Sequence, residues 1–164
     1  MVGMVSIWAI RLAGFLFVRV KRVGKDIRFD SVKTKPSTFL VWWTLQALWV
    51  LTTMAAALAI VTGGERVSMS WLGWTGCGVW LFGFAVEVVA DAQKSSFKMD
   101  PTNRGQFIRT GLWAWSRHPN YFGEIVLWIG VALMAVPVLT GWQYATLISP
   151  VFVTFLLMKM SGVP

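Results

Sequence analysis

The stretch "MSWLGWTGCGVWLFGFAVEVVA", residues 69–90, predicts the kind of fold that this chain adopts. It is apolar over roughly the 20 residues that a helix needs to cross the hydrocarbon core of a bilayer. It also holds four glycines, Gly73, Gly76, Gly78 and Gly83. Small residues let helices approach each other closely in lipid. We therefore expect a membrane-spanning helix that packs closely against a neighbour.

Similar apolar stretches lie on both sides of this one. The whole sequence is 56% hydrophobic and 13% charged, whereas soluble domains carry about 25% charged residues. The composition predicts an all-α, polytopic integral membrane bundle with about five transmembrane helices in a single domain, residues 1–164. Besides residues 69–90, the expected spans are 1–20, 38–62, 121–139 and 142–160. The first is expected to be retained rather than cleaved as a signal peptide, because its basic residues follow the apolar run.

The basic residues are concentrated in two connections, 19–37 and 91–121. The connections 63–68 and 139–141 hold one basic residue between them, Arg66. Lys and Arg accumulate in cytoplasmic loops, and five spans place both basic loops on one side. The net charge of +8 is therefore expected to reflect topology and contact with anionic headgroups or phosphate, and not nucleic-acid binding.

Arg11, Glu87 and Glu124 lie inside predicted spans, where ionisable residues are energetically costly. Arg11 is expected to snorkel or to pair with a carboxylate. Glu87 and Asp91 are four residues apart and share a helix face, so a cation or hydrogen-bond donors must separate them unless both are solvated. Such a pair could accept hydrogen bonds from ribose hydroxyls or an amide, or hold a basic residue aimed at phosphate.

The segment "SRHPNYFGE", residues 116–124, gathers polar side chains between apolar stretches. The proline restricts His118 to an extended conformation and is itself suited to the first turn of a helix. A helix is therefore expected to begin near Pro119, with Asn120 and Glu124 on one face.

The start of this helix is a candidate ligand site. Backbone N–H groups and the positive helix end favour anions there, and Arg117 and His118 strengthen that preference. Tyr121 lies on an adjoining face. The simpler alternative is that His118 only caps the helix.

The sequence gives no indication of a metal site or a nucleotide-binding glycine motif. Its single histidine and single cysteine, His118 and Cys77, are far apart in the chain, so no zinc or iron site is expected. No serine elbow accompanies the histidine, so a hydrolytic triad is not indicated either.

The combination of "EVVADAQKSSF" and "GLWAWSRHPNYFGE" resembles a bacterial membrane family related to steroid 5α-reductases, the DUF1295 group. "WAIRLAGFLFVRV" and the closing "SGVP" are similar to the same group. The motif "RHPNY" also resembles a motif of sterol reductases. The pattern R-H-P-x-Y-x-G, residues 117–123, is similar to one in isoprenylcysteine carboxyl methyltransferases, which use S-adenosylmethionine.

The resemblance implies an enzyme that reduces a conjugated C=C bond in a steroid-like or other lipophilic substrate, with NADPH bound on the cytoplasmic side of a bacterial inner membrane. Asn120 and Glu124 match the pair that holds the nicotinamide end, Asp91 matches an acidic contact, and Lys98 looks equivalent to a phosphate contact. The complete set of cofactor contacts that the resemblance implies is Glu87, Asp91, Lys98, Arg117, His118, Asn120, Tyr121 and Glu124.

The chain also departs from the family. It has about five expected spans where steroid reductases have roughly seven, and the family's acid–tyrosine pair that polarises the substrate has no counterpart. The sequence therefore leaves the catalytic residues unassigned. The alternatives are a methyltransferase that uses S-adenosylmethionine and a non-catalytic membrane protein.

Overall fold

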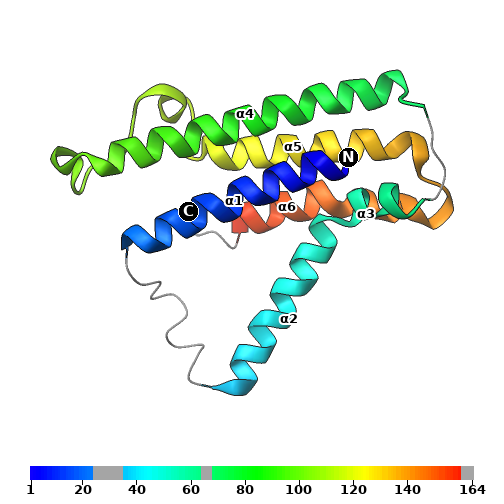
Figure 1. Cartoon of the computed structure of the whole chain (residues 1–164), viewed down its shortest axis with the longest axis horizontal. Coiled ribbons are helices and arrows are strands. Elements are labelled where there is room, and N and C mark those ends of the chain that lie inside the picture. The colour runs from blue at the N-terminus through cyan, green and yellow to red at the C-terminus, as the bar shows by residue number, and fades with distance from the viewer. Residues whose placement is uncertain (24–34, 64–67, 160–164) are drawn as a thin grey trace.

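The computed structural model describes residues 1–23, 35–63 and 68–159, and every regular element in these ranges is a helix. This confirms the predicted all-α class. Figure 1 shows the main helices as a bundle from which one helix projects. They are α1 (Val2–Val23), α2 (Pro36–Thr53), α3 (Ala55–Thr62), α4 (Trp71–Met99), α5 (Pro119–Ala135) and α6 (Ile148–Lys159). Short 3-10 helices are η2 (Pro101–Asn103), η3 (Gly111–Ala114), η4 (Val136–Val138) and η5 (Gly141–Leu147).

The fold is that of a multi-pass membrane protein. In the described part of the chain, 4 helical segments are long and apolar enough to cross a membrane, or 5 if a bent pair is counted as one span. The 29 residues of α4 correspond to about 43 Å at about 1.5 Å per residue. The hydrocarbon core is about 30 Å thick. The last turns of α4, beyond the predicted end at residue 90, can therefore extend into the headgroup region.

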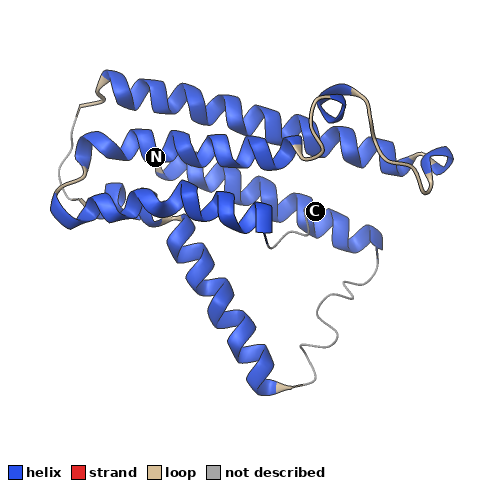
Figure 2. Cartoon of the chain, turned by 180° about the vertical axis from the view of Figure 1, so that it is seen from behind, coloured by secondary structure: helices blue, strands red, loops and turns tan. Residues whose placement is uncertain are grey.

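The expected single span at 38–62 is instead a broken helix. α2 and α3 meet at an angle of 60°, and Met54 forms the end of one helix and the start of the other. The Ser149 hydroxyl, from the first turn of α6, donates a hydrogen bond to the Thr53 carbonyl at the break. A side chain inserted at a helix backbone is a recognised cause of a kink. Figures 1 and 2 show that α2 diverges from the bundle as a result.

Helices α4 and α5 pack with their backbones in direct contact. A Cβ atom added at Gly83 would lie 2.5 Å from the Leu127 amide nitrogen and 2.6 Å from the Gly123 carbonyl oxygen. One added at Gly76 would lie 2.7 Å from the Gly130 carbonyl oxygen. The two glycines on each helix are seven residues apart, so they recur on the same side of a helix at every second turn.

The prediction of close helix packing is therefore confirmed for two of the four glycines of α4. An added Cβ at Gly73 would meet only the side chains of Met69 and Ser70, at 3.4 Å or more. Gly78 faces open space within 4 Å. These two glycines lie off the stripe that faces α5.

Helix α1 is lightly attached to the bundle. Only 6% of its membrane-spanning window is buried. One stripe of side chains packs against the core, and within it Trp8 meets Trp128 of α5 edge to face, with ring centroids 5.1 Å apart. Arg11 continues this stripe and bonds to α4.

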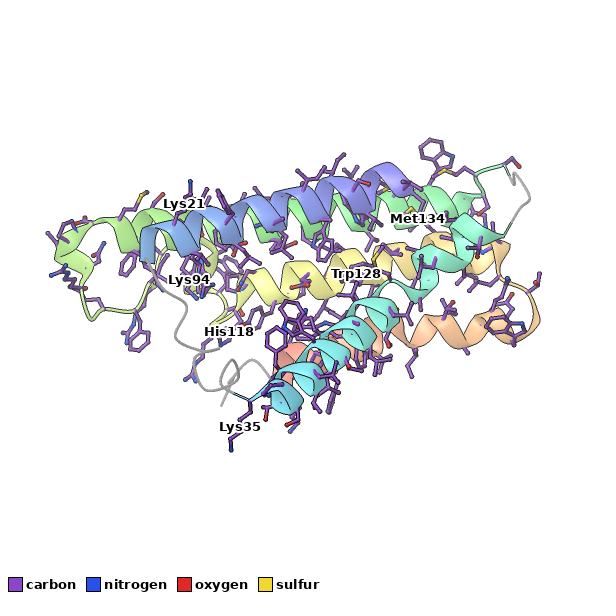
Figure 3. All side chains as sticks on the ribbon, turned by 60° about the horizontal axis from the view of Figure 1, so that its bottom comes forward. Lys21, Lys35, Lys94, His118, Trp128 and Met134 are labelled. Atoms are coloured by element: carbon purple, nitrogen blue, oxygen red, sulfur yellow. The ribbon has the colours of Figure 1, made fainter. Side chains whose placement is uncertain are left out.

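Lys21, Lys94 and His118 lie at one end of the bundle, whereas Lys35 lies at the start of α2, the helix that projects from it (Figures 1 and 3). Figure 3 shows Lys21 at the end of α1, Lys94 near the end of α4 and His118 before α5 together at this end, with Met134 at the other. That the two basic connections share one side of a membrane stays a prediction. Residues 24–34, which carry further basic residues of the first connection, lie outside the described residues.

Substitution of Gly83 by alanine should destabilise the bundle, because the added methyl group would overlap backbone atoms of α5 that cannot rotate away. Overpacking of this kind costs about 1–3 kcal/mol in free energy of unfolding. Gly78→Ala is the matched control, on the same helix but in open space, and its stability should stay within about 0.5 kcal/mol of the wild type. Thermal unfolding in detergent measures both, and equal effects would contradict this packing.

Candidate functional site

The site is built where α4 ends and α5 begins, and the loop between them is held against α4. The Gln93 side-chain oxygen accepts a hydrogen bond from the Leu112 amide at 3.0 Å. The Trp113 indole N–H donates to the Ala90 carbonyl at 3.0 Å. Gly111 has a φ of 60°, a conformation that favours glycine, and Gln93 fills the space where its Cβ would be. The motif "GLWAW" therefore serves to dock the loop.

A basic cleft lies between this loop and α4. Its volume is about 940 Å³. Five Lys and Arg side chains and one His contribute to its lining, and no Asp or Glu does among the residues that the structure describes. The basic cleft is lined by Lys94, Phe97, Lys98, Asn103, Arg104, Gly105, Gln106, Phe107, Ile108, Arg109, Trp113, Arg117 and His118. Its composition suits an anionic ligand with several charged groups.

Lys94 and His118 mark the inner end of the basic cleft. The Lys94 amine lies over the Trp113 ring, 4.5 Å from its centroid, a favourable cation–π geometry. The rings of His118 and Tyr121 stack with centroids 4.9 Å apart. His118 precedes α5, and its side chain makes no capping hydrogen bond, so the simpler alternative of a capping role does not describe it.

The pKa of His118 lies below its ordinary value of 6.5 because of partial burial, and secondarily because of the charges of Lys94 and Arg117. His118 is thus predominantly neutral at pH 7. Because folding lowers the pKa of His118, protonation favours the unfolded chain. Stability therefore falls as the pH drops from 6.5 towards the lowered pKa of the folded state. An anion in the basic cleft would oppose the positive charges and raise this pKa.

A carboxylate cluster lies one turn deeper along α4. Arg11 forms a fork, with Nη1 2.5 Å from Glu87 Oε1 and Nη2 bonded to Asp91 Oδ2. Both carboxylates are buried, with 3% and 7% of their surfaces exposed. The expectation that Arg11 pairs with a carboxylate is therefore confirmed, and the cation required between the two acids is supplied by α1.

The start of α5 completes the carboxylate cluster from the other side. A Cβ at Gly123 would lie 2.6 Å from the Glu87 amide nitrogen, so α5 touches α4 at Glu87. Glu124 is half-buried and interacts electrostatically with Glu87, Asp91 and Arg11. Asn120 lies one turn before Glu124 on the same helix. Two carboxylates therefore pair with one guanidinium, and the Glu124 carboxylate interacts with it electrostatically.

Several buried polar atoms in and around the carboxylate cluster have no hydrogen-bond partner in the structure. They include Glu87 Oε2 and Asn120 Oδ1. The Trp8 indole N–H is directed at the Glu87 carboxylate as a hydrogen-bond donor. Buried polar atoms are rarely left without partners, so these oxygens are candidate contacts for a polar ligand or water. No group of three His, Cys, Asp or Glu side chains in the described ranges could hold a metal ion.

The structure divides the predicted site residues between the two parts of the site. Lys98, Arg117 and His118 line the basic cleft, and Tyr121 stacks on His118. The other four predicted contacts belong to the carboxylate cluster and do not line the basic cleft; they are Glu87, Asp91, Asn120 and Glu124. The expectation that α5 begins near Pro119 is confirmed.

Sequence reasoning did not single out the residues that α1 contributes to the site, Trp8 in particular. Arg11 was expected to snorkel or to pair with a carboxylate, and it was not among the predicted cofactor contacts. Trp8 and Arg11 are three residues apart and therefore share a helix face. This spacing was the signal available in the sequence, but the sequence of α1 alone does not show what that face packs against. The sequence analysis also did not predict that Lys94 contacts Trp113, although both residues lie in stretches that carry the family resemblance.

Comparison with known proteins shows the relationships of the chain. All of it, residues 1–164, matches the family described as "Protein of unknown function (DUF1295)". It is 31% identical over 94 residues to an uncharacterised protein of Schizosaccharomyces pombe, covering 46% of this chain and 27% of the relative. It is 30% identical over 102 residues to a probable O-methyltransferase of Ustilaginoidea virens, covering 62% of this chain and 36% of the relative.

A third relative is the 3-oxo-5-alpha-steroid 4-dehydrogenase 1 of Bos taurus, 31% identical over 71 residues, which cover 43% of this chain and 27% of that protein. The matches thus span between about a quarter and about a third of the length of these curated relatives. No solved structure matches the chain. The relatives with named activities fall into two enzyme classes, a dehydrogenase and a methyltransferase.

The single histidine of the chain makes the electrostatics of the basic cleft directly measurable. NMR titration of His118 in lipid nanodiscs should give a pKa below 6.5, and Lys94→Gln should raise it because one neighbouring charge is removed. Lys21→Gln, at the end of α1, is the control and should leave the pKa unchanged. A wild-type pKa of 6.5 or higher would contradict the described surroundings of His118.

Proposed function

This chain belongs to the DUF1295 family, and we propose that it is a membrane-embedded, NADPH-dependent reductase of a conjugated C=C bond in a steroid-like or other lipophilic substrate. The similarity to a steroid 4-dehydrogenase supports an oxidoreductase. The proposal depends most on one observation, the adjacency of a strongly basic cleft and a buried carboxylate cluster. The two parts complement the two ends of a dinucleotide.

The basic cleft suits the phosphate end of the cofactor. NADPH carries a pyrophosphate and a 2′-phosphate, and the five Lys and Arg side chains of the basic cleft could neutralise both. Arginine forks bind phosphate in a bidentate manner, whereas lysine acts as a point charge. Arg117 and Lys98 would thus serve as phosphate contacts, and the N–H groups at the start of α5 would add to the attraction.

The carboxylate cluster suits the nicotinamide end. Glu87 and Asn120 present buried oxygen acceptors without partners, and Glu124 lies beside them. A carboxamide offers N–H donors for such acceptors. When bound, the cofactor supplies a hydride to the β-carbon of an enone, and a proton from solvent reaches the α-carbon. The role of the protein residues is to bind the cofactor and orient the ring.

The proposed topology follows from the same arrangement. The basic end of the bundle would face the cytoplasm of a bacterium, since basic loops are retained there, and NADPH would enter from that side. The lipophilic substrate would enter from the bilayer.

A second candidate function is methyl transfer from S-adenosylmethionine. The three carboxylates around Arg11 could accommodate its sulfonium and ammonium groups, and one relative is named a probable O-methyltransferase. The basic cleft favours the reductase, because S-adenosylmethionine has a single carboxylate to set against five cationic side chains.

Removal of single charges from the basic cleft should weaken NADPH binding. Arg117→Gln and Lys98→Gln are each expected to raise the dissociation constant about tenfold, since a hydrogen bond to a charged group contributes about 1.5–3 kcal/mol. The wild-type affinity should also fall as salt is raised. Isothermal titration calorimetry in nanodiscs measures the binding.

Lys21→Gln is the control for this experiment, because it removes a charge at the same end of the bundle but outside the basic cleft. It should bind NADPH with wild-type affinity. Thermal stabilisation by S-adenosylhomocysteine, together with no binding of NADPH, would refute the reductase and favour the methyltransferase.

A further inference from the structure

A second hollow lies on the surface of α4, beside the basic cleft. It is an open groove of about 600 Å³ between α4 and the connection that follows it, which folds back over the helix in Figure 1. Phe97, Asn103 and Ile108 line both the groove and the basic cleft, so these three residues form the wall between them. The proposed function does not use the groove.

The lining of the groove changes from apolar to polar along α4. Val88, Val89 and Ala92 line it towards the middle of the helix, whereas Ser96 and Asp100 line it at the end. The helix is about 43 Å long, at about 1.5 Å per residue, and the hydrocarbon core is about 30 Å thick. Its polar last turns are the part that can extend into the headgroup region. The groove therefore offers acyl-chain and headgroup surroundings in the order in which a phospholipid presents these parts.

Opposite charges lie on the two sides of the groove. Among the described residues that line it, Asp100 alone is charged at neutral pH. One Asp100 oxygen accepts hydrogen bonds from the hydroxyl and the amide of Thr102, and these bonds hold the pKa of Asp100 below its ordinary value. Arg104 and Arg109 line the basic cleft, on the far side of the shared wall. A headgroup in the groove would thus lie between a carboxylate and two guanidinium groups.

We propose that the groove binds a phospholipid with a primary ammonium headgroup, as in phosphatidylethanolamine. The ammonium pairs with Asp100, the phosphate lies towards Arg104 and Arg109, and an acyl chain follows the apolar half of the groove. A primary ammonium has three N–H donors for the carboxylate, whereas the quaternary ammonium of a choline lipid has none. A lipid with net negative charge would bring the wrong sign to Asp100. The inference is independent of the proposed function, because the lipid lies outside the basic cleft.

Headgroup selectivity tests the proposal. The probes are the palmitoyl-oleoyl forms of phosphatidylethanolamine, phosphatidylcholine and phosphatidylglycerol, which share their acyl chains. Native mass spectrometry of the full chain, released from detergent micelles, measures the dissociation constant of the first bound lipid. The wild type should bind the ethanolamine lipid about threefold more tightly than either of the others, a modest ratio because an exposed ion pair contributes little.

Two variants test the two halves of the groove. Asp100→Asn keeps an oxygen that can accept from Thr102 but removes the charge, so the preference for the ethanolamine lipid over the choline lipid should disappear. Ala92→Trp fills the apolar half and should weaken the binding of all three lipids about tenfold. Ala85→Trp is the matched control, because Ala85 is also an exposed alanine of α4 but does not line the groove. It should keep the wild-type affinities.

Several results would overturn the proposal. Equal affinity of the wild type for the ethanolamine and choline lipids would do so, as would a preference that persists in Asp100→Asn. Unchanged affinities in Ala92→Trp would show that the lipid binds elsewhere. Tightest binding of the glycerol lipid would place the headgroup in the basic cleft instead. None of these measurements involves NADPH, so failure of the reductase proposal would leave this test unaffected.

Discussion

The direct backbone contact between α4 and α5 is the constraint on which the structure depends. Lipid tails are as apolar as leucine, so helices in a membrane are held together by close packing and polar contacts. The paired glycines supply that packing, since any side chain at Gly83 or Gly123 would collide with the facing backbone. The Gly123 contact falls at Glu87. The same packing that joins the helices therefore brings the polar start of α5 against the acids of α4.

The second constraint is the burial of charge that follows from this packing. Three carboxylates would repel one another strongly in a low-dielectric interior, and a buried charge must be paired to be tolerated. Arg11 pairs with Glu87 and Asp91, and this fork is a principal attachment of α1. A buried ion pair is weak evidence for stability in itself, because desolvation offsets much of the attraction. Its retention is better explained by the orientation it gives to the two carboxylates.

The sequence predicted those features that depend on local chemistry. Pro119 fixed the start of α5 through its effect on the residue before it, and the long apolar runs indicated helices of membrane-spanning length. Features that depend on distant partners were not predictable in this way. The break after Thr53 is associated with the hydroxyl of Ser149, 96 residues away, and "TTMAAAL" contains no proline or glycine that would signal it. Similarly, Gly76 and Gly78 look alike until the position of α5 shows that only Gly76 faces it.

The candidate site shows the same division. Residue types and the family resemblance identified eight predicted site residues. They did not indicate that these residues separate into a basic cleft and a carboxylate cluster. That separation follows the length of α4, because Lys94 and Lys98 lie about two and three turns further along this helix than Glu87. Cations are least costly at the interface, and carboxylates deeper in the bundle are tolerated because α1 supplies a guanidinium. The length of α4 and the position of Arg11 together thus produce a site that is positive at its mouth and rich in acceptors at its inner end.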